Sequence, residues 1–166
     1  SESSRTYRIG FGSADGPFSV PRVIELSSPL PVIQAKVEID GFISGLLWKA
    51  YGATVSGNDQ YRVFEVAPGG RLRLAGLTVA NGRADSGAGI LNYGRLVIEG
   101  VTLLENHATE AGGAFANQGG EAFMINSTAY ANRAGRGGAV ANLAGRLRLT
   151  NVTLHQNQAA TGSAVF

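Results

Sequence analysis

The feature that most constrains this fold is a repeat of about 25 residues in the second half of the chain. The phrases GAGILN, GGAFAN and GGAVAN each end in an asparagine, and these asparagines are 25 residues apart in both steps. A second series closes TLLEN, TAYAN and TLHQN at spacings of 26 and 25 residues. A fixed period of this length is typical of solenoids, in which each repeat stacks on its neighbours. The two series are Asn92, Asn117 and Asn142, and Asn106, Asn132 and Asn157.

Within each repeat, polar and apolar residues alternate over a few positions. In RLRLAGLTV, Leu72 and Leu74 alternate with Arg71 and Arg73. Strict alternation over this length is typical of a half-buried strand, and no segment of the repeats keeps a 3.6-residue period long enough for a helix. Three short strands in every coil of about 25 residues predict an all-β fold, a parallel β-helix.

Stacking in register turns each repeat position into a column along the solenoid. The glycines of the Gly-Gly-Ala phrases supply positive φ or room at a corner. We predict that the asparagines lie at corners and form two amide ladders, since stacked parallel strands bring identical amides together. We predict that the apolar residue two places before each first-series asparagine fills the interior. These residues are Ile90, Phe115 and Val140, with Val165 in the unfinished last copy.

The chain of 166 residues is predicted to form one domain without a linker. We expect an N-terminal cap over residues 1–19, degenerate coils over 20–69 and regular coils over 70–166, the last one incomplete. The sequence stops at Phe166 in the middle of a repeat. We therefore expect an open last coil, covered by a protein partner, a second copy or further chain.

Composition narrows the classes of function. The chain has no cysteine, which excludes disulfides and thiolate metal sites. Its 14 basic and 12 acidic residues leave a net charge of +2, too small to predict a nucleic-acid partner. No apolar run approaches the roughly 20 residues of a membrane span.

Candidate catalytic residues are few. Glu38 and Asp40, two residues apart, form the best carboxylate pair, but the sequence offers no basic partner that can be placed beside them. His107 and His155 have no matching ligands for a metal. We therefore predict no catalytic residue, no metal and no cofactor. A polysaccharide lyase or glycoside hydrolase is the alternative, because such enzymes need clustered carboxylates.

Two kinds of surface column are candidates for binding. Arg71, Arg95 and Arg146 share a repeat position with Glu121 and form a candidate anion- or glycan-binding stripe, the alternative being ordinary outward surface. Outward apolar residues form a candidate partner-packing surface, together with the last residues of the open coil. These residues are Val97, Leu104, Phe123, Tyr130, Val165 and Phe166.

The motifs GGAFAN and GGAVAN resemble the Gly-Gly-Ala-apolar motif of polymorphic outer membrane protein repeats. LLEN and LHQN resemble the companion Phe-x-x-Asn motif, although Leu103, Ala129 and Leu154 stand where that family has phenylalanine. The resemblance covers roughly residues 24 to 166. It implies a right-handed parallel β-helix that is exported by a bacterium to its cell surface, periplasm or surroundings.

Members of that family are autotransporter passengers, adhesins or proteins of unknown role. Its motifs build corners, so no catalytic residue carries over. The resemblance and the residues together predict a non-enzymatic surface scaffold, adhesin or structural subunit of an extracellular or membrane-associated assembly. We expect it to dock partners through the open C-terminal coil and the outward apolar columns. The alternative is a protein that binds or cleaves polysaccharide.

Overall fold

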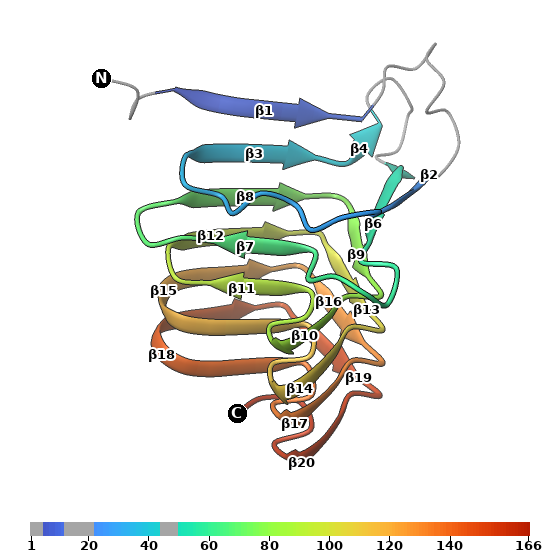
Figure 1. The fold of residues 1–166 in the computed structure, drawn as a ribbon, viewed down its shortest axis with the longest axis vertical. Coiled ribbons are helices and arrows are strands. Elements are labelled where there is room, and N and C mark those ends of the chain that lie inside the picture. Colours follow the sequence, from blue (N-terminus) through green and yellow to red (C-terminus); the bar gives the residue numbers. More distant parts are fainter. Residues whose placement is uncertain (1–4, 12–21, 44–49) are drawn as a thin grey trace.

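The computed structural model describes residues 5–11, 22–43 and 50–166, and in these ranges all regular structure is β. The strands pair in parallel, apart from the short antiparallel pair β4 (Phe42–Ile43) and β5 (Ala50–Tyr51). The coils stack from β1 to β20 along the long axis of the molecule (Figure 1). The predicted parallel β-helix is therefore confirmed. Of the predicted cap, residues 1–19, only 5–11 lie within the described residues.

The first sheet contains two sets of strands: those predicted from the arginine-rich phrases, such as β8 and β12, and those in line with the first asparagine series, such as β11. In the later coils the two sets are continuous, because β15 pairs with both sets and β18 pairs with both parts of β15. The members are β1 (Thr6–Gly10), β3 (Lys36–Asp40), β7 (Phe64–Val66), β8 (Arg71–Ala75), β11 (Ile90–Asn92), β12 (Arg95–Glu99), β15 (Phe115–Ile125) and β18 (Val140–Thr150).

Two further sheets close the coil. The second sheet comprises β2 (Arg22–Glu25), β6 (Ala53–Ser56), β9 (Thr78–Ala80), β13 (Thr102–Leu104), β16 (Thr128–Tyr130) and β19 (Thr153–His155). The third comprises β10 (Arg83–Ser86), β14 (His107–Ala111), β17 (Arg133–Arg136) and β20 (Gln158–Thr161). The degenerate coils share the register of the regular ones, since Thr54 pairs with Thr78 and Phe64 with Ile90.

The core consists of columns of apolar residues inside the stack. Ile90, Phe115 and Val140 lie in register and are fully buried, as the repeat predicted. Leu72 and Leu96 form a second inward column in the first sheet. Each inward residue therefore packs on its counterpart in the next coil, where it replaces contact with water.

Left-handed backbone forms the corners. One column consists of glycines, Gly87, Gly112, Gly137 and Gly162, with φ between 57° and 62°. Another consists of Asn81, Glu105, Ala131 and Gln156, with φ between 50° and 55°. Side chains other than asparagine disfavour this conformation. The same turn recurs in these coils despite the changes of residue, so stacking of the coils overrides the local preference.

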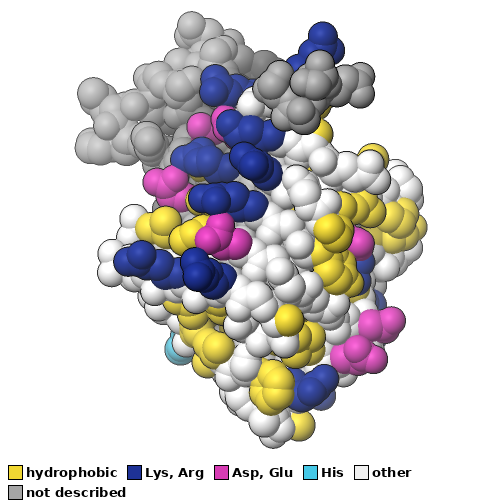
Figure 2. Space-filling view, turned by 90° about the vertical axis from the view of Figure 1, so that its left-hand side faces the viewer, with side chains coloured by type: hydrophobic (Ala, Val, Ile, Leu, Met, Phe, Trp, Pro, Cys, Tyr) yellow, Lys and Arg dark blue, Asp and Glu magenta, His cyan; other side chains and the backbone are white. Residues whose placement is uncertain are grey.

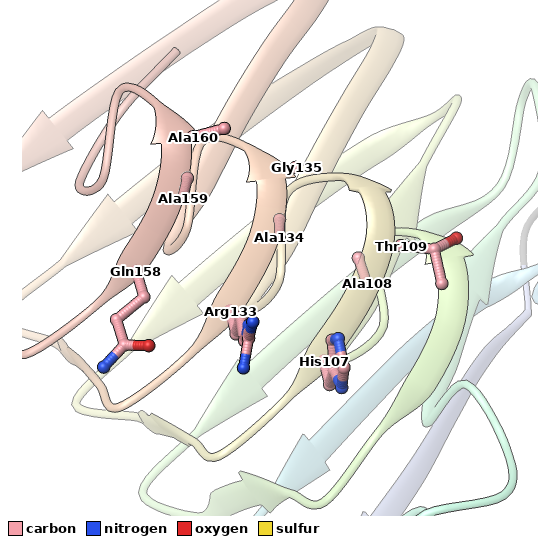
Figure 3. Close-up of a pocket in the computed structure, with 9 residues that line it drawn as sticks. All are labelled: His107, Ala108, Thr109, Arg133, Ala134, Gly135, Gln158, Ala159 and Ala160. Atoms are coloured by element: carbon pink, nitrogen blue, oxygen red, sulfur yellow. The ribbon is translucent and has the colours of Figure 1, made fainter.

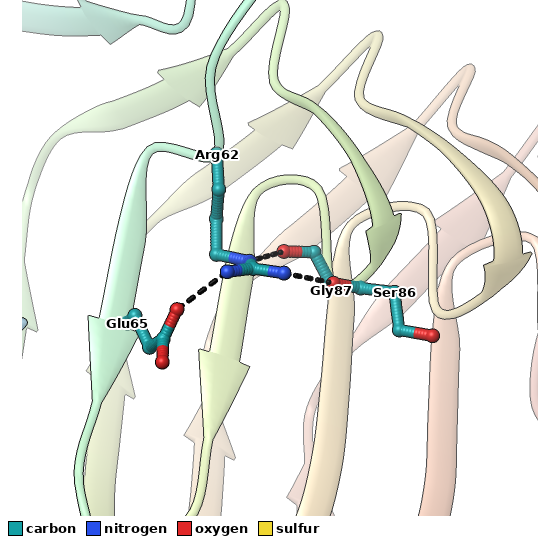
Figure 4. A network of polar contacts seen from close by, with 4 residues as sticks. All are labelled: Arg62, Glu65, Ser86 and Gly87. Carbon is teal, nitrogen blue, oxygen red and sulfur yellow. Dashed lines mark hydrogen bonds and ion pairs between the residues drawn. The ribbon is translucent and has the colours of Figure 1, made fainter. Parts of the chain in front are cut away.

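A polar contact holds one of these corners to the preceding coil. Arg62, in the loop before β7, donates hydrogen bonds from Nη2 to the Ser86 carbonyl at 3.1 Å and from Nε to the Gly87 carbonyl at 3.2 Å. Its guanidinium also pairs with the carboxylate of Glu65 (Figure 4). Arg62 therefore supports the left-handed turn at Gly87 from a coil whose sequence lacks the repeat motif.

Substitution of Gly113 by alanine is expected to lower the free energy of unfolding by about 2–3 kcal/mol. A Cβ there would lie 2.4 Å from the Gly138 carbonyl oxygen and 2.5 Å from that of Arg133, and both belong to the backbone of the next coil. Urea unfolding followed by circular dichroism measures the change. Gly10→Ala is the control, because a Cβ at Gly10 meets nothing within 4 Å. Equal unfolding midpoints for the two variants would contradict the prediction.

Candidate functional site

The first predicted asparagine ladder is present at the end of β11 and at the aligned positions of β15 and β18. Asn92 Nδ2 donates to Asn117 Oδ1, and Asn117 Nδ2 donates to Asn142 Oδ1, both at 2.8 Å. Asn92 and Asn117 are fully buried, whereas Asn142 is half-buried. The amides of this ladder bond to neighbouring coils, so they stabilise the stack and are not free to hold a ligand.

The second ladder follows the same rule. Asn106 Nδ2 donates to Asn132 Oδ1 and Asn132 Nδ2 to Asn157 Oδ1, both at 3.0 Å. Each acceptor oxygen also receives the backbone N–H of the preceding asparagine, at 3.0 Å and 2.9 Å. The same arrangement reaches one coil further back, where the Gly82 N–H donates to Asn106 Oδ1 at 2.8 Å.

The outward side of the first sheet is rich in arginine. Arg71, Arg95, Glu121 and Arg146 lie in register as predicted, and Lys36 extends their column by one strand. We call the outward side chains of β1, β3, β8, β12, the second half of β15 and β18 the basic face. Figure 2 shows Lys and Arg side chains gathered in a band with a few acidic side chains between them.

The basic face concentrates positive charge. It has seven cations and four anions, an excess of three (7 − 4), whereas the net charge of the whole chain is +2. The cations are Arg8, Lys36, Arg71, Arg73, Arg95, Arg146 and Arg148, and the anions are Glu38, Asp40, Glu99 and Glu121. Such a concentration attracts an anionic partner even when the net charge is small.

Ion pairs occupy part of this face. Arg95 Nη1 lies 2.9 Å from Glu121 Oε2, and Arg73 Nη2 lies 2.6 Å from Glu99 Oε2. Arg71, Arg146 and Arg148 are exposed and make no ion pair within the described ranges. Because neighbouring glutamates do not neutralise these three guanidinium groups, they are available to external anions.

Glu38 differs from the sequence expectation, because the fold supplies the basic partners that the sequence did not reveal. Its carboxylate lies 3.1 Å from Lys36 Nζ on the same strand and 3.1 Å from Arg8 Nε on β1. The hydrogen bond from Lys36 is the main cause that lowers the pKa of Glu38, and Arg8 also lowers it. The group therefore stays ionised at neutral pH and is unsuited to donate a proton as a general acid.

A hollow opens at the edge of the basic face beside Arg71. It has a volume of about 510 Å³, and its lining includes Arg5, Lys36 and Arg71 together with Tyr7 and Gln34. The sequence did not reveal this site, because Arg5 and Lys36 come from coils outside the regular repeat. Three cations with no acidic side chain in the lining favour an anion.

The predicted partner-packing residues do not form one surface. Val97 and Phe123 are half-buried neighbours on the basic face, where the guanidinium carbon of Arg95 lies 5.5 Å from the Phe123 ring centroid. Leu104 and Tyr130 are neighbours on the second sheet. There, the Tyr130 ring stacks on His155 with centroids 5.7 Å apart.

Val165 and Phe166 lie in the last coil and are 41% and 43% exposed. Val165 bridges to Val140, and the guanidinium carbon of Arg136 lies 5.1 Å from the centroid of the Phe166 ring. Docking of a partner on these two residues stays a prediction.

The third sheet carries a hollow that the sequence analysis missed. It has a volume of about 520 Å³ and spans β14, β17 and β20. His107, Arg133 and Gln158 lie on neighbouring strands and point to the same side (Figure 3). Each directly follows an asparagine of the second series, and this shared repeat position is the signal that could have revealed the column.

His107 lies between two arginines of that column, because Arg83 precedes it and Arg133 follows it in register. Partial burial lowers the pKa of His107, and the charges of Arg83 and Arg133 lower it further, while Asp59 opposes the shift. The imidazole is therefore neutral at pH 7 and above.

No protein-family model matches the chain, and no curated protein or solved structure matches it significantly. The resemblance to polymorphic outer membrane protein repeats therefore stays a prediction. Among the described residues, no helix is long and apolar enough to cross a membrane. In the same part of the chain, no group of three or more His, Asp or Glu side chains could hold a metal ion. Fold and surface define a parallel β-solenoid with a basic face and a separate hollow on the third sheet.

Proposed function

We propose that this protein is a non-enzymatic scaffold whose basic face docks a protein partner rich in carboxylates. The observation that carries the proposal is the set of unpaired guanidinium groups of Arg71, Arg146 and Arg148 on a face that also presents Val97 and Phe123. Arginine and aromatic side chains are enriched in protein interfaces, and the guanidinium fork matches a carboxylate. The partner identified by this chemistry is an acidic protein surface.

The stack gives this face its rigidity. Neighbouring strands are about 4.8 Å apart, so the backbone positions that carry the cations form fixed rows before any partner arrives. Preorganised side chains lose less entropy on binding than side chains on a mobile loop. Because the repeat motifs resemble those of exported surface proteins, we propose that the protein lies outside the cell or at its surface, as an adhesin or structural subunit of an assembly.

Binding of an acidic polysaccharide is the second candidate, favoured by the hollow beside Arg71. Tyr7 and Gln34 in its lining offer hydrogen-bonding groups to sugar hydroxyls, and Arg5, Lys36 and Arg71 offer charge to an acidic group. Cleavage of such a polymer is less well supported, because Lys36 and Arg8 hold the Glu38 carboxylate in its ionised form.

Conversion of Arg71, Arg146 and Arg148 to glutamine is expected to weaken binding of poly-glutamate about tenfold, because each unpaired charge adds to the attraction. Titration of the labelled polymer at low salt measures the affinity, and added salt is expected to weaken the wild-type complex.

The control triple variant is Gln60→Glu, Thr153→Glu and Gln156→Glu, all at exposed positions away from the basic face. Both variants have a net charge of −1 (2 − 3). If both lose the same affinity, the effect is one of net charge, and the docking face is not where we place it. Absence of binding to the wild-type protein would also contradict the proposal.

A further inference from the structure

The hollow on the third sheet combines unpaired polar groups with a floor of small side chains. The Arg133 guanidinium is exposed and makes no ion pair or hydrogen bond with the part of the chain that the structure describes. His107 and Gln158 flank it on the neighbouring strands. A row of one cation, one imidazole and one amide therefore faces solvent along one side of the hollow (Figure 3).

The floor is shallow and consists of small residues. Ala108 and Ala134 are buried beneath it, and Gly135 and Ala160 line it where larger side chains would fill it. The strand register shifts between His107 and Ala111, so the strand pairing is irregular beside the hollow. The volume of about 520 Å³ lies within the roughly 300–1,000 Å³ of small-molecule sites.

We propose that this hollow binds a carboxylated sugar, with the carboxylate on Arg133 and His107 and the ring against the alanine and glycine floor. A guanidinium binds a carboxylate through two parallel hydrogen bonds. The Gln158 amide donates and accepts, and the Thr109 hydroxyl, which donates to Asp85 Oδ1 at 3.2 Å, can still accept a bond from a sugar hydroxyl. A flat floor can contact the C–H face of a sugar ring. It has no large apolar side chains that would bind a peptide side chain. The site lies on a different sheet from the basic face and does not depend on the proposed function.

Charge around His107 makes the binding depend on pH. The groups that face the imidazole are Arg83, Arg133 and Asp59, and the two arginines oppose its protonation. A bound carboxylate offsets the arginine charge and favours the protonated imidazole, so binding takes up a proton. The complex is therefore tighter at low pH, where a sugar carboxylate is still ionised.

Calorimetric titration of the whole chain with a uronate trisaccharide tests the proposal. We expect binding at least about threefold tighter near pH 5 than near pH 7.5. Arg133→Gln is expected to weaken it about tenfold at both pH values. His107→Gln keeps a hydrogen-bonding side chain of similar size and is expected to bind with no pH dependence in this range. Ala160→Trp, at an exposed position, is expected to abolish binding by filling the hollow.

Arg136→Gln is the matched control, since it removes an exposed arginine from the same strand, outside the lining of the hollow and away from the basic face. Thermal unfolding of each variant checks that it folds. An equal loss in Arg136→Gln and Arg133→Gln would overturn the proposed location. Binding of a neutral trisaccharide or of inorganic phosphate as tightly as the uronate would overturn the ligand class. No uronate binding by the wild-type protein near pH 5 would overturn the site.

Discussion

Replacing Asn117 by alanine is expected to lower the free energy of unfolding by about 4 kcal/mol. The two N–H groups of its side-chain amide are shared among acceptors that include Asn142 Oδ1 at 2.8 Å, the Ala144 carbonyl at 3.0 Å and the Gly120 carbonyl at 3.1 Å. Its oxygen accepts the bond from Asn92 at 2.8 Å. Alanine would remove these contacts, two of which involve the buried Asn92 and Gly120, and each unsatisfied buried group costs about 1–3 kcal/mol.

Asn142→Ala is the matched control for that experiment. Asn142 occupies the same column but is half-buried, and among the described residues its side chain accepts one hydrogen bond, from Asn117. We expect its loss to cost about 1 kcal/mol, because water can replace the missing acceptor. Urea unfolding followed by circular dichroism compares the two variants. Equal losses would show that burial in the ladder does not determine its contribution.

Replacing Phe115 by alanine is expected to cost about 3–5 kcal/mol of unfolding free energy. The side chain is fully buried and packs in register between Ile90 and Val140. Its removal leaves a cavity that the neighbouring coils cannot close without moving their own columns. Phe115→Leu keeps most of the volume and is expected to cost about 1.5 kcal/mol, so it remains measurable if the alanine variant fails to fold.

Phe123→Ala provides the control on the same strand. Phe123 points outward from β15 and is half-buried beside Arg95. We expect its removal to cost less than about 1 kcal/mol. A loss as large as that of Phe115→Ala would mean that the inward and outward assignment of this strand is wrong.

The two proposed binding surfaces lie on different sheets of one solenoid. Arg133 and Arg148 are exposed side chains on different sheets, so a substitution of one need not disturb the other. Arg148 and Arg133 can therefore be changed separately, and the two sets of variants report on separate ligands. This separation makes failure of one proposal distinguishable from failure of the other.

The regular coils could be predicted from the sequence, because stacking at a constant period brings residues that are one repeat apart into contact. Residues 25 apart, such as Asn92 and Asn117, become neighbours without any further information. The same holds for Arg95 and Glu121, 26 apart, whose pairing follows from the aligned phrases. The ladders, the core column around Phe115 and the stripe of arginines could all be predicted in this way.

Several residues of the first coils are not about 25 residues from the residues they pair with. The sequence therefore did not predict these partners. Lys36 aligns with Arg71 across 35 residues (71 − 36), and Arg8 aligns with Glu38 across 30 (38 − 8). No motif marks these distances, so the partners of Glu38 and the extension of the basic column were not predictable. Arg62 was missed for another reason: its partners Ser86 and Gly87 lie 24 and 25 residues further along the chain, but no motif aligns its loop with the later repeats.

The hollow on the third sheet was missed for a different reason. The column of His107, Arg133 and Gln158 could be predicted, because each residue follows an asparagine of the second series. The depth of the hollow could not, because it depends on the positions of Gly135 and Ala160 next to the register shift between β14 and β17. Sequence alone therefore determined which residues stack, because identical positions in coils of equal length must meet. Only the tertiary structure decided which outward charges stay unpaired and where the surface is hollow, because side-chain reach and coils of unequal length set both.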